Sequence, residues 1–253
     1  MADYAIGSIG GNFQALRTLL DQIGFDPAAD RVWLAGNLAG DGEQTLEVLR
    51  FVKSLGKSAV SVLGDRDLQL LSAAAGFCEP IAGFEPVLAA PDRDELLKWL
   101  RQRGLIHHDA KLNYTLVHAG IPAEWSFSQA ITFAYEVESV LSQSQYRAFL
   151  ENHRQDQSRW HAKLRGWKRL NFIANACTRM KYCNAAGKLD FSASGPVAEQ
   201  NPELMPWYRL PDRRASQLRI VFADDAGFQD QDCSDVYPLP AVCAQIAVRL
   251  ADR

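Results

Sequence analysis

The chain has 253 residues, 47% of them hydrophobic, and its 27 basic and 30 acidic residues leave a net charge of -3. This length suits one large domain or two small ones, and the composition supplies an ordinary globular core. The near balance of charge excludes a general nucleic-acid-binding surface, and no apolar run approaches the roughly 20 residues that cross a bilayer. We therefore expect a cytoplasmic protein with no membrane partner.

The first predicted elements are a strand, a sharp turn and a helix. A short apolar run ends in Gly7-Ser8-Ile9-Gly10-Gly11, and residues 14–23 carry apolar side chains at helical spacing. In many hydrolases a turn at the end of a strand holds carboxylates and imidazoles for a metal. Ser8 and Gly10 offer only a hydroxyl and backbone atoms here.

Two more strand-to-loop junctions follow. Residues 31–35 predict a strand that runs into the loop 36–42, and residues 59–63 predict another that ends in Gly64-Asp65-Arg66-Asp67. Helices are predicted at 45–55 and 68–75, so the pattern indicates an α/β fold with a largely parallel core sheet. Because the carboxyl ends of such strands meet at one edge, we expect the polar groups of the three junctions to lie close together.

The later part of the chain adds a helix at 91–104 and a strand at 112–117 that ends in His118. Residues 125–214 are rich in helix formers, aromatic residues and arginines, which indicates a helical cap inserted into the α/β unit. Arg179, Lys181 and Trp207 put cations beside aromatic rings, a combination that binds phosphates and stacks on bases, although a solvated amphipathic helix also explains it. Further strands are predicted at 218–223, before Asp224-Asp225, and at 242–250.

The strand-end motifs and several long runs carry a resemblance to a known family. These runs are Val32 to Leu38, Val48 to Gly56, Leu116 to Ile121, Leu164 to Gly166 and Asn175 to Met180. The chain resembles, over nearly its whole length, the symmetrical bis(5'-nucleosyl)-tetraphosphatases, the diadenosine tetraphosphate hydrolases among the calcineurin-like metallophosphoesterases. The resemblance implies a sandwich of two central β-sheets flanked by helices, with residues 1–253 as a single domain and 125–214 as its cap insertion.

The chain departs from the family at the positions that carry the chemistry. In the family the first junction supplies an aspartate and a histidine to one metal, and the matching positions are Ser8 and Gly10. The second junction supplies a metal-bridging aspartate and an arginine, where this chain has Asn37 and Asp41.

The third junction and the late motif of the family also differ here. The third junction supplies an asparagine ligand and the histidine that protonates the leaving group, and these positions hold Asp65 and Arg66. The late histidine ligand is matched by Asp224, whereas the histidine of the His-Ala-Gly motif is unchanged as His118.

These departures predict a catalytically inactive homologue, a pseudoenzyme with no catalytic residues. Two-metal phosphoester hydrolysis needs a pair of cations about 3.5–4 Å apart, and Ser8 and Gly10 cannot hold the first of them. Arg66 cannot donate a proton, because a guanidinium stays charged at any accessible pH. We expect no cofactor and a regulatory role in binding either a nucleotide, such as a dinucleoside polyphosphate, or an unidentified protein. The candidate ligand-binding residues are Arg66, Arg179, Lys181 and Trp207.

The alternative is an active nucleotide phosphohydrolase with a rebuilt one-metal site. Asp65 and Asp224 place oxygen ligands where the second metal of the family lies. Together with Asn37 and His118 they provide an oxygen-rich set that suits a single Mg²⁺ or Mn²⁺ better than Zn²⁺. Such an enzyme would act on dinucleoside polyphosphates.

Overall fold

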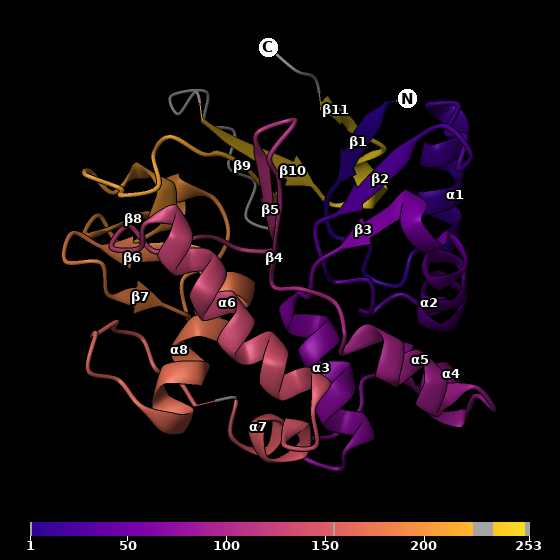
Figure 1. Cartoon of the computed structure of the whole chain (residues 1–253), viewed down its shortest axis with the longest axis horizontal. Coiled ribbons are helices and arrows are strands. Elements are labelled where there is room, and N and C mark those ends of the chain that lie inside the picture. The colour runs from indigo at the N-terminus through magenta and orange to yellow at the C-terminus, as the bar shows by residue number, and fades with distance from the viewer. Residues whose placement is uncertain (1, 154, 225–234, 251–253) are drawn as a thin grey trace.

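Two four-stranded sheets form the centre of the computed structural model, which describes residues 2–153, 155–224 and 235–250 (Figure 1). The first sheet has the order β11 (Val248–Leu250), β1 (Asp3–Ile6), β2 (Arg31–Leu34) and β3 (Ala59–Ser61). The second has the order β10 (Val236–Pro240), β9 (Arg219–Asp224), β5 (Tyr114–Val117) and β4 (Ile106–Asp109). Within each sheet three strands run parallel, and β11 and β4 are antiparallel edge strands. The predicted α/β sandwich is confirmed.

The strands pack on both faces because alternate side chains point to opposite sides. Ala5 and Trp33 join a cluster with Leu116 and Val221 of the second sheet, which fills the space between the sheets. Their neighbours along the first sheet, such as Ile6, belong to the larger cluster that includes the helices. The near-continuous apolar strands of the sequence therefore reflect burial on both faces.

Helices cover the outer face of the first sheet and continue below it (Figure 1). They are α1 (Phe13–Gln22), α2 (Thr45–Ser54), α3 (Asp65–Ala74), α4 (Glu85–Ala89) and α5 (Arg93–Leu100). In α1 the buried residues Leu16, Leu19 and Leu20 lie three and four positions apart, as an amphipathic helix requires. The third predicted helix begins three residues earlier than expected, because Asp67 Oδ2 accepts a hydrogen bond from Gly64 N at 2.9 Å and closes its first turn.

The segment 125–214 contains more than helices. It holds α6 (Phe127–Ser142), α7 (Tyr146–Asn152) and α8 (Gly166–Arg179), followed by a small antiparallel sheet of β6 (Tyr182–Asn184), β7 (Leu189–Asp190) and β8 (Leu204–Pro206). α8 packs against α3, α6 and α7, so this segment shares a core with the rest of the chain. Its role as an inserted cap stays a prediction.

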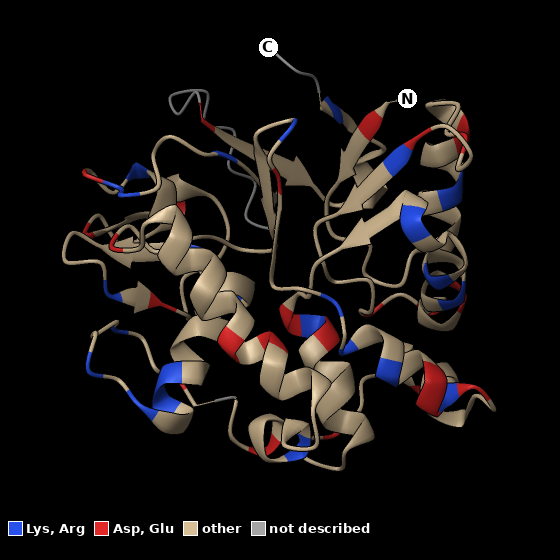
Figure 2. Ribbon diagram, in the orientation of Figure 1, with Lys and Arg blue, Asp and Glu red and all other residues tan. Residues whose placement is uncertain are grey.

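The predicted strand 242–250 is wrong in its first half. A short 3-10 helix spans Val242–Ala244, and only β11 is extended, because Gln245 adopts a left-handed conformation with φ of 55° that breaks the strand. Within the described ranges, no helix combines the length and the apolar character that crossing a bilayer requires. Figure 2 shows acidic and basic residues together at the N-terminal end of α3, the end that points toward the sheets.

Candidate active site

The first two strand-end junctions interlock through their main chains. Gly10 N donates a hydrogen bond to Asn37 O at 2.6 Å, Gly11 N donates to Leu38 O at 3.0 Å, and Gly42 N donates to Gly10 O at 2.9 Å. The junctions approach so closely that a Cβ on Gly40 would lie 2.5 Å from Gly10 Cα. Glycine is required there by space, and these contacts between the two loops join backbone to backbone.

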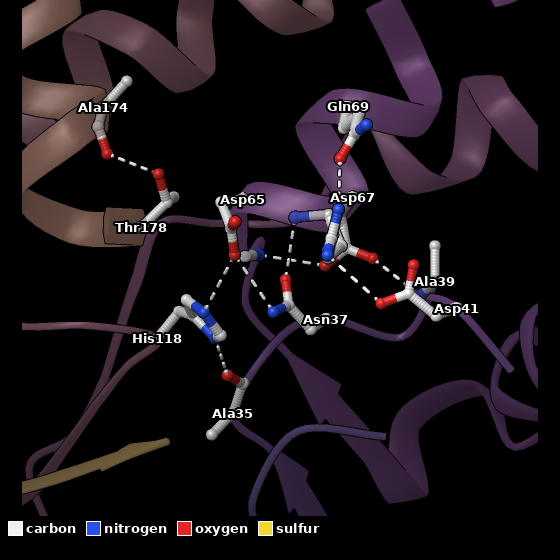
Figure 3. A network of polar contacts seen from close by, with 12 residues as sticks. Ala35, Asn37, Ala39, Asp41, Asp65, Asp67, Gln69, His118, Ala174 and Thr178 are labelled. Atoms are coloured by element: carbon white, nitrogen blue, oxygen red, sulfur yellow. Dashed lines mark hydrogen bonds and ion pairs between the residues drawn. The ribbon is translucent and has the colours of Figure 1, made fainter. Parts of the chain in front are cut away.

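Asn37 connects the second junction to the third (Figure 3). Its Nδ2 donates to Asp65 Oδ1 at 3.0 Å, and its Oδ1 accepts from the backbone N of Arg66 at 2.9 Å. Behind it, the fully buried Asp67 accepts hydrogen bonds from Ala39 N and Gly64 N, both at 2.9 Å. Burial raises the pKa of Asp67 to about 6. The third junction is thus fixed to the second by both side chains and backbone.

His118 at the end of β5 faces the same point from the second sheet. Its Nδ1 lies 2.6 Å from the carbonyl oxygen of Ala35, and since a carbonyl only accepts, we assign the proton to Nδ1. Nε2 then faces Asp65 Oδ1 at 3.5 Å (Figure 3). Desolvation opposes ionisation of Asp65, but His118, Asn37 and Arg66 together hold the pKa of its carboxyl well below the usual range. Nε2 of His118 and the Asp65 carboxylate therefore face each other, an arrangement that a proton on Nε2 or a metal cation between them satisfies.

A cavity of about 790 Å³ opens above this pair. Nine of the residues singled out in the sequence line it, namely Ser8, Gly10, Asn37, Asp41, Asp65, Arg66, His118, Arg179 and Lys181. The three strand-end junctions thus meet in one place, as the parallel topology implied, and His118 of the second sheet and the end of α8 join them there.

Two predicted residues are not placed in this cavity. Trp207 is 2% exposed and packs beside Gly120, Tyr208 and Phe222, so its ring belongs to the core and is not among the lining residues. Asp224 ends β9 with its backbone, but its side chain lies outside what the structure describes, as does the whole of Asp225.

Arg66 and Asp41 form an ion pair that the sequence did not predict. Arg66 Nη2 lies 3.1 Å from Asp41 Oδ2, and Nη1 donates to Gln69 Oε1 at 2.8 Å. Both positions depart from the family motifs, one losing a cation and the other gaining one. The complementary sign of the two changes was the signal that could have revealed the pair.

Few donors for a metal lie at this edge. Asp65 and His118 face each other, Asn37 turns its NH2 group toward Asp65, and the buried Oγ of Ser8 at the cavity wall has no hydrogen-bond partner. In the part of the chain that the structure describes, no group of three or more His, Cys, Asp or Glu side chains gathers. The remaining oxygen and nitrogen donors are the kind that Mg²⁺ or Mn²⁺ accepts.

Comparison with known proteins identifies the relatives of this chain. The family model for calcineurin-like phosphoesterases matches residues 4–177. A Methylococcus capsulatus protein named symmetrical bis(5'-nucleosyl)-tetraphosphatase is 46% identical to this chain, and the alignment covers 88% of this chain and 80% of the relative. A protein of the same name from Thioalkalivibrio sulfidiphilus is 44% identical, and the alignment covers 88% of this chain and 83% of that relative. A crystal structure provisionally named as a diadenosine tetraphosphatase aligns with a TM-score of 0.62 and 18% identity, over 100% of this chain and 94% of its own, and supports the fold alone.

These relatives correct two predictions. The expectation of a pseudoenzyme is contradicted, because relatives at 39–46% identity over most of the chain are named as tetraphosphatases, which favours an active hydrolase. The expectation of no cofactor is contradicted too, because the family normally uses a divalent metal. In physical terms, the loss of ligands at Ser8 and Gly10 does not empty the site, since Asp65 and His118 still face each other at the cavity.

Three findings agree on the ancestry of the chain. The two-sheet sandwich has the fold of the solved neighbour, the strand ends converge on one cavity, and the relatives match over most of its length. The chain belongs to the symmetrical bis(5'-nucleosyl)-tetraphosphatase family of calcineurin-like phosphoesterases.

Proposed function

We propose that this chain is a metal-dependent phosphohydrolase of dinucleoside polyphosphates, with one divalent cation held between Asp65 and His118 and with Asn37 orienting the Asp65 carboxylate. The observation that carries the proposal is the pair formed by His118 Nε2 and Asp65 Oδ1, 3.5 Å apart at the wall of the cavity. In metal sites a ligating histidine commonly donates its other ring N–H to a carbonyl, as Nδ1 does to Ala35 here.

The reaction is the hydrolysis of a phosphoanhydride. The oxygen of water bonds to phosphorus and its protons pass to solvent, the bond from that phosphorus to a bridging oxygen breaks, and cleavage at the middle of a tetraphosphate gives two nucleoside diphosphates. A cation bound at Asp65 would act as a Lewis acid toward a phosphoryl oxygen. The other charged groups that would act on the substrate are side chains of the protein.

Arg66 has a role in this reaction that needs no proton transfer. A nucleoside diphosphate leaves as a stable anion, so the leaving group needs its charge stabilised more than it needs a proton. A guanidinium placed where negative charge develops supplies that stabilisation. Arg66 lines the cavity next to Asp65, and Arg179 and Lys181 add two further cations for the phosphates.

The compartment is a further part of the proposal. The four described cysteines, Cys78, Cys177, Cys183 and Cys243, are free thiols, which is usual in the reducing cytoplasm. Residence in the cytoplasm therefore stays our prediction.

A turnover assay tests the proposed activity. The purified chain is incubated with diadenosine tetraphosphate and Mg²⁺ or Mn²⁺, and ADP release is followed. We expect metal-dependent turnover, and we expect Asp65→Ala and His118→Ala to lower kcat/KM by roughly a hundredfold or more. His161→Ala is the matched control, because His161 is exposed and lies outside the cavity lining. A folded protein without metal-dependent turnover would refute the proposal, as would turnover that survives both substitutions.

A further inference from the structure

A second cavity lies directly beside the first. It has a volume of about 440 Å³, and it shares Asp65, Arg66, Thr178 and Arg179 with the cavity of about 790 Å³. Both volumes fall within the range of about 300–1,000 Å³ that is typical of small-molecule sites. The four shared residues come from the start of α3 and the end of α8, two helices that pack against each other. The two cavities therefore adjoin along these four residues, which form a shared wall.

Arg66 spans this wall from the side of α3. Its Nη2 contacts Asp41, which lines only the larger cavity, at 3.1 Å, and its Nη1 contacts Gln69, which lines only the smaller one, at 2.8 Å. Asp41 is 73% exposed, and so exposed an ion pair contributes little to stability. A phosphate can displace it, because guanidinium binds phosphate with two parallel charge-assisted hydrogen bonds.

Arg179 spans the wall in the same way from the side of α8. Its guanidinium carbon lies 4.5 Å from the ring centre of Phe191, which lines the larger cavity. Its Nη1 contacts Asp156 at 2.9 Å and Asn175 at 3.2 Å, and both of these line the smaller cavity. Asp156 is 66% exposed, so this ion pair is also weak. Each arginine thus has partners in both compartments and an aspartate that a phosphate can replace.

We infer that the two cavities form one elongated substrate site, with one nucleoside end in each cavity and the polyphosphate chain held between them by Arg66 and Arg179. This inference rests on the proposed function, which it extends to the placement of the substrate. Asp65 also lies on the shared wall, so the middle of the phosphate chain passes the carboxylate that faces His118. That position accounts for cleavage into two equal halves.

The stoichiometry of binding tests the inference without turnover. Calorimetry in EDTA measures the affinity and the number of bound molecules for diadenosine tetraphosphate and for ADP, the half-length ligand. We expect one tetraphosphate but two ADP molecules for each chain. Arg66→Gln and Arg179→Gln should each weaken tetraphosphate binding roughly tenfold, since each removes charge-assisted hydrogen bonds to phosphate.

Substitutions at the rims separate the two compartments. Asp156→Trp adds bulk to the smaller cavity, and Ser194→Trp, at an exposed residue that lines only the larger one, is the matched substitution. Each should reduce bound ADP from two molecules to one and weaken tetraphosphate binding roughly tenfold. Asp156→Asn removes the charge without the bulk and should keep two ADP molecules.

Two outcomes would overturn the inference: a single ADP bound to the unsubstituted chain, or tetraphosphate affinity that Asp156→Trp leaves within twofold. Thermal unfolding of each variant shows that it is folded. The turnover assay remains separate, so two-compartment binding without metal-dependent hydrolysis would count against the proposed function and not against the elongated site.

Discussion

Replacing Gly64 with alanine should damage folding and the site together, although glycine at this position is not needed for its backbone conformation. Gly64 has an ordinary φ of -105°, so alanine meets no backbone strain. Its Cβ would, however, lie 2.1 Å from Asn37 Oδ1 and 2.6 Å from Asn37 N, distances that real Cβ atoms do not tolerate. Asn37 must therefore move.

The displacement of Asn37 breaks specific interactions whose cost can be summed. Asn37 loses the hydrogen bonds to Arg66 N and to the charged Asp65 Oδ1, at 2.9 and 3.0 Å, and its carbonyl, which binds Gly10 N, shifts as well. Two such bonds and the overpacking together are worth about 3–5 kcal/mol. We expect the free energy of unfolding of Gly64→Ala to fall by this amount, and kcat/KM to fall with it.

Urea denaturation followed by circular dichroism measures the effect, with Gly24→Ala as the control. Gly24 has open space around its Cβ position but a left-handed φ of 63°, so alanine there should cost only about 1–2 kcal/mol. If Gly64→Ala proves no more destabilising than Gly24→Ala, close approach of the second and third junctions is not what requires glycine.

Three further predictions concern the sheets, the cation and the segment after β5. Arg31 Nε lies 2.6 Å from Asp3 Oδ1, and its Nη2 lies 2.9 Å from Asp109 Oδ2. Arg31→Met should lower the free energy of unfolding, measured in urea, by about 2–3 kcal/mol, a value reduced because Arg31 is partly exposed. Burial opposes ionisation of Asp109, but backbone N–H groups and Arg31 lower its pKa in the folded state. The ionised carboxylate therefore contributes to stability above the ordinary aspartate pKa, and this contribution is lost as the pH falls through the lowered pKa. The destabilisation caused by Arg31→Met should accordingly be smaller at low pH. Mn²⁺ at roughly 100 times its Kd should stabilise the protein by about 2.7 kcal/mol, or about 5–10 °C in Tm by scanning fluorimetry, and His118→Ala should abolish the shift. Trp125 is fully buried among aromatic rings, so Trp125→Ala should lower the free energy of unfolding by about 3–5 kcal/mol. If residues 125–214 share the core, this variant should unfold in a single transition, and two separate transitions would contradict that.

Periodicity and turn residues were enough to predict most of the sandwich. Strands β1, β2, β5 and β9 were predicted because runs buried on both faces are apolar at nearly every position. The sequence did not indicate β4, because Ile106–Asp109 reads Ile-His-His-Asp and is held by pairing with β5. The strands β6 to β8 were missed for a different reason, since they span only two or three residues each and are too short to show an alternating pattern.

The sequence predicted which residues lie at the site but not how their side chains contact one another. Parallel strands of one sheet place their carboxyl ends at one edge, which was enough to bring Asn37 and Asp65 together. His118 ends a strand of the second sheet, and its place beside them followed from the family resemblance. The pairing of Arg66 with Asp41 depends on side-chain rotamers that no spacing rule gives. Trp207 was misplaced because a cation beside an aromatic ring in the sequence does not reveal whether the ring faces a cavity or the core.

The main-chain hydrogen bonds that lock the first two junctions bear on how such a site can change. Gly10 N, Gly11 N and Gly42 N are all satisfied by backbone carbonyls, so this part of the loop frame does not depend on the side chain at position 8. The Ser8 side chain can then be exchanged without loss of a hydrogen bond, since its Oγ has no partner, whereas exchange of Asn37 would break its bonds to Asp65 and Arg66. A fold with such loops can be fitted with new donor sets for different cations, and the engineering of a second cation site would begin at Ser8.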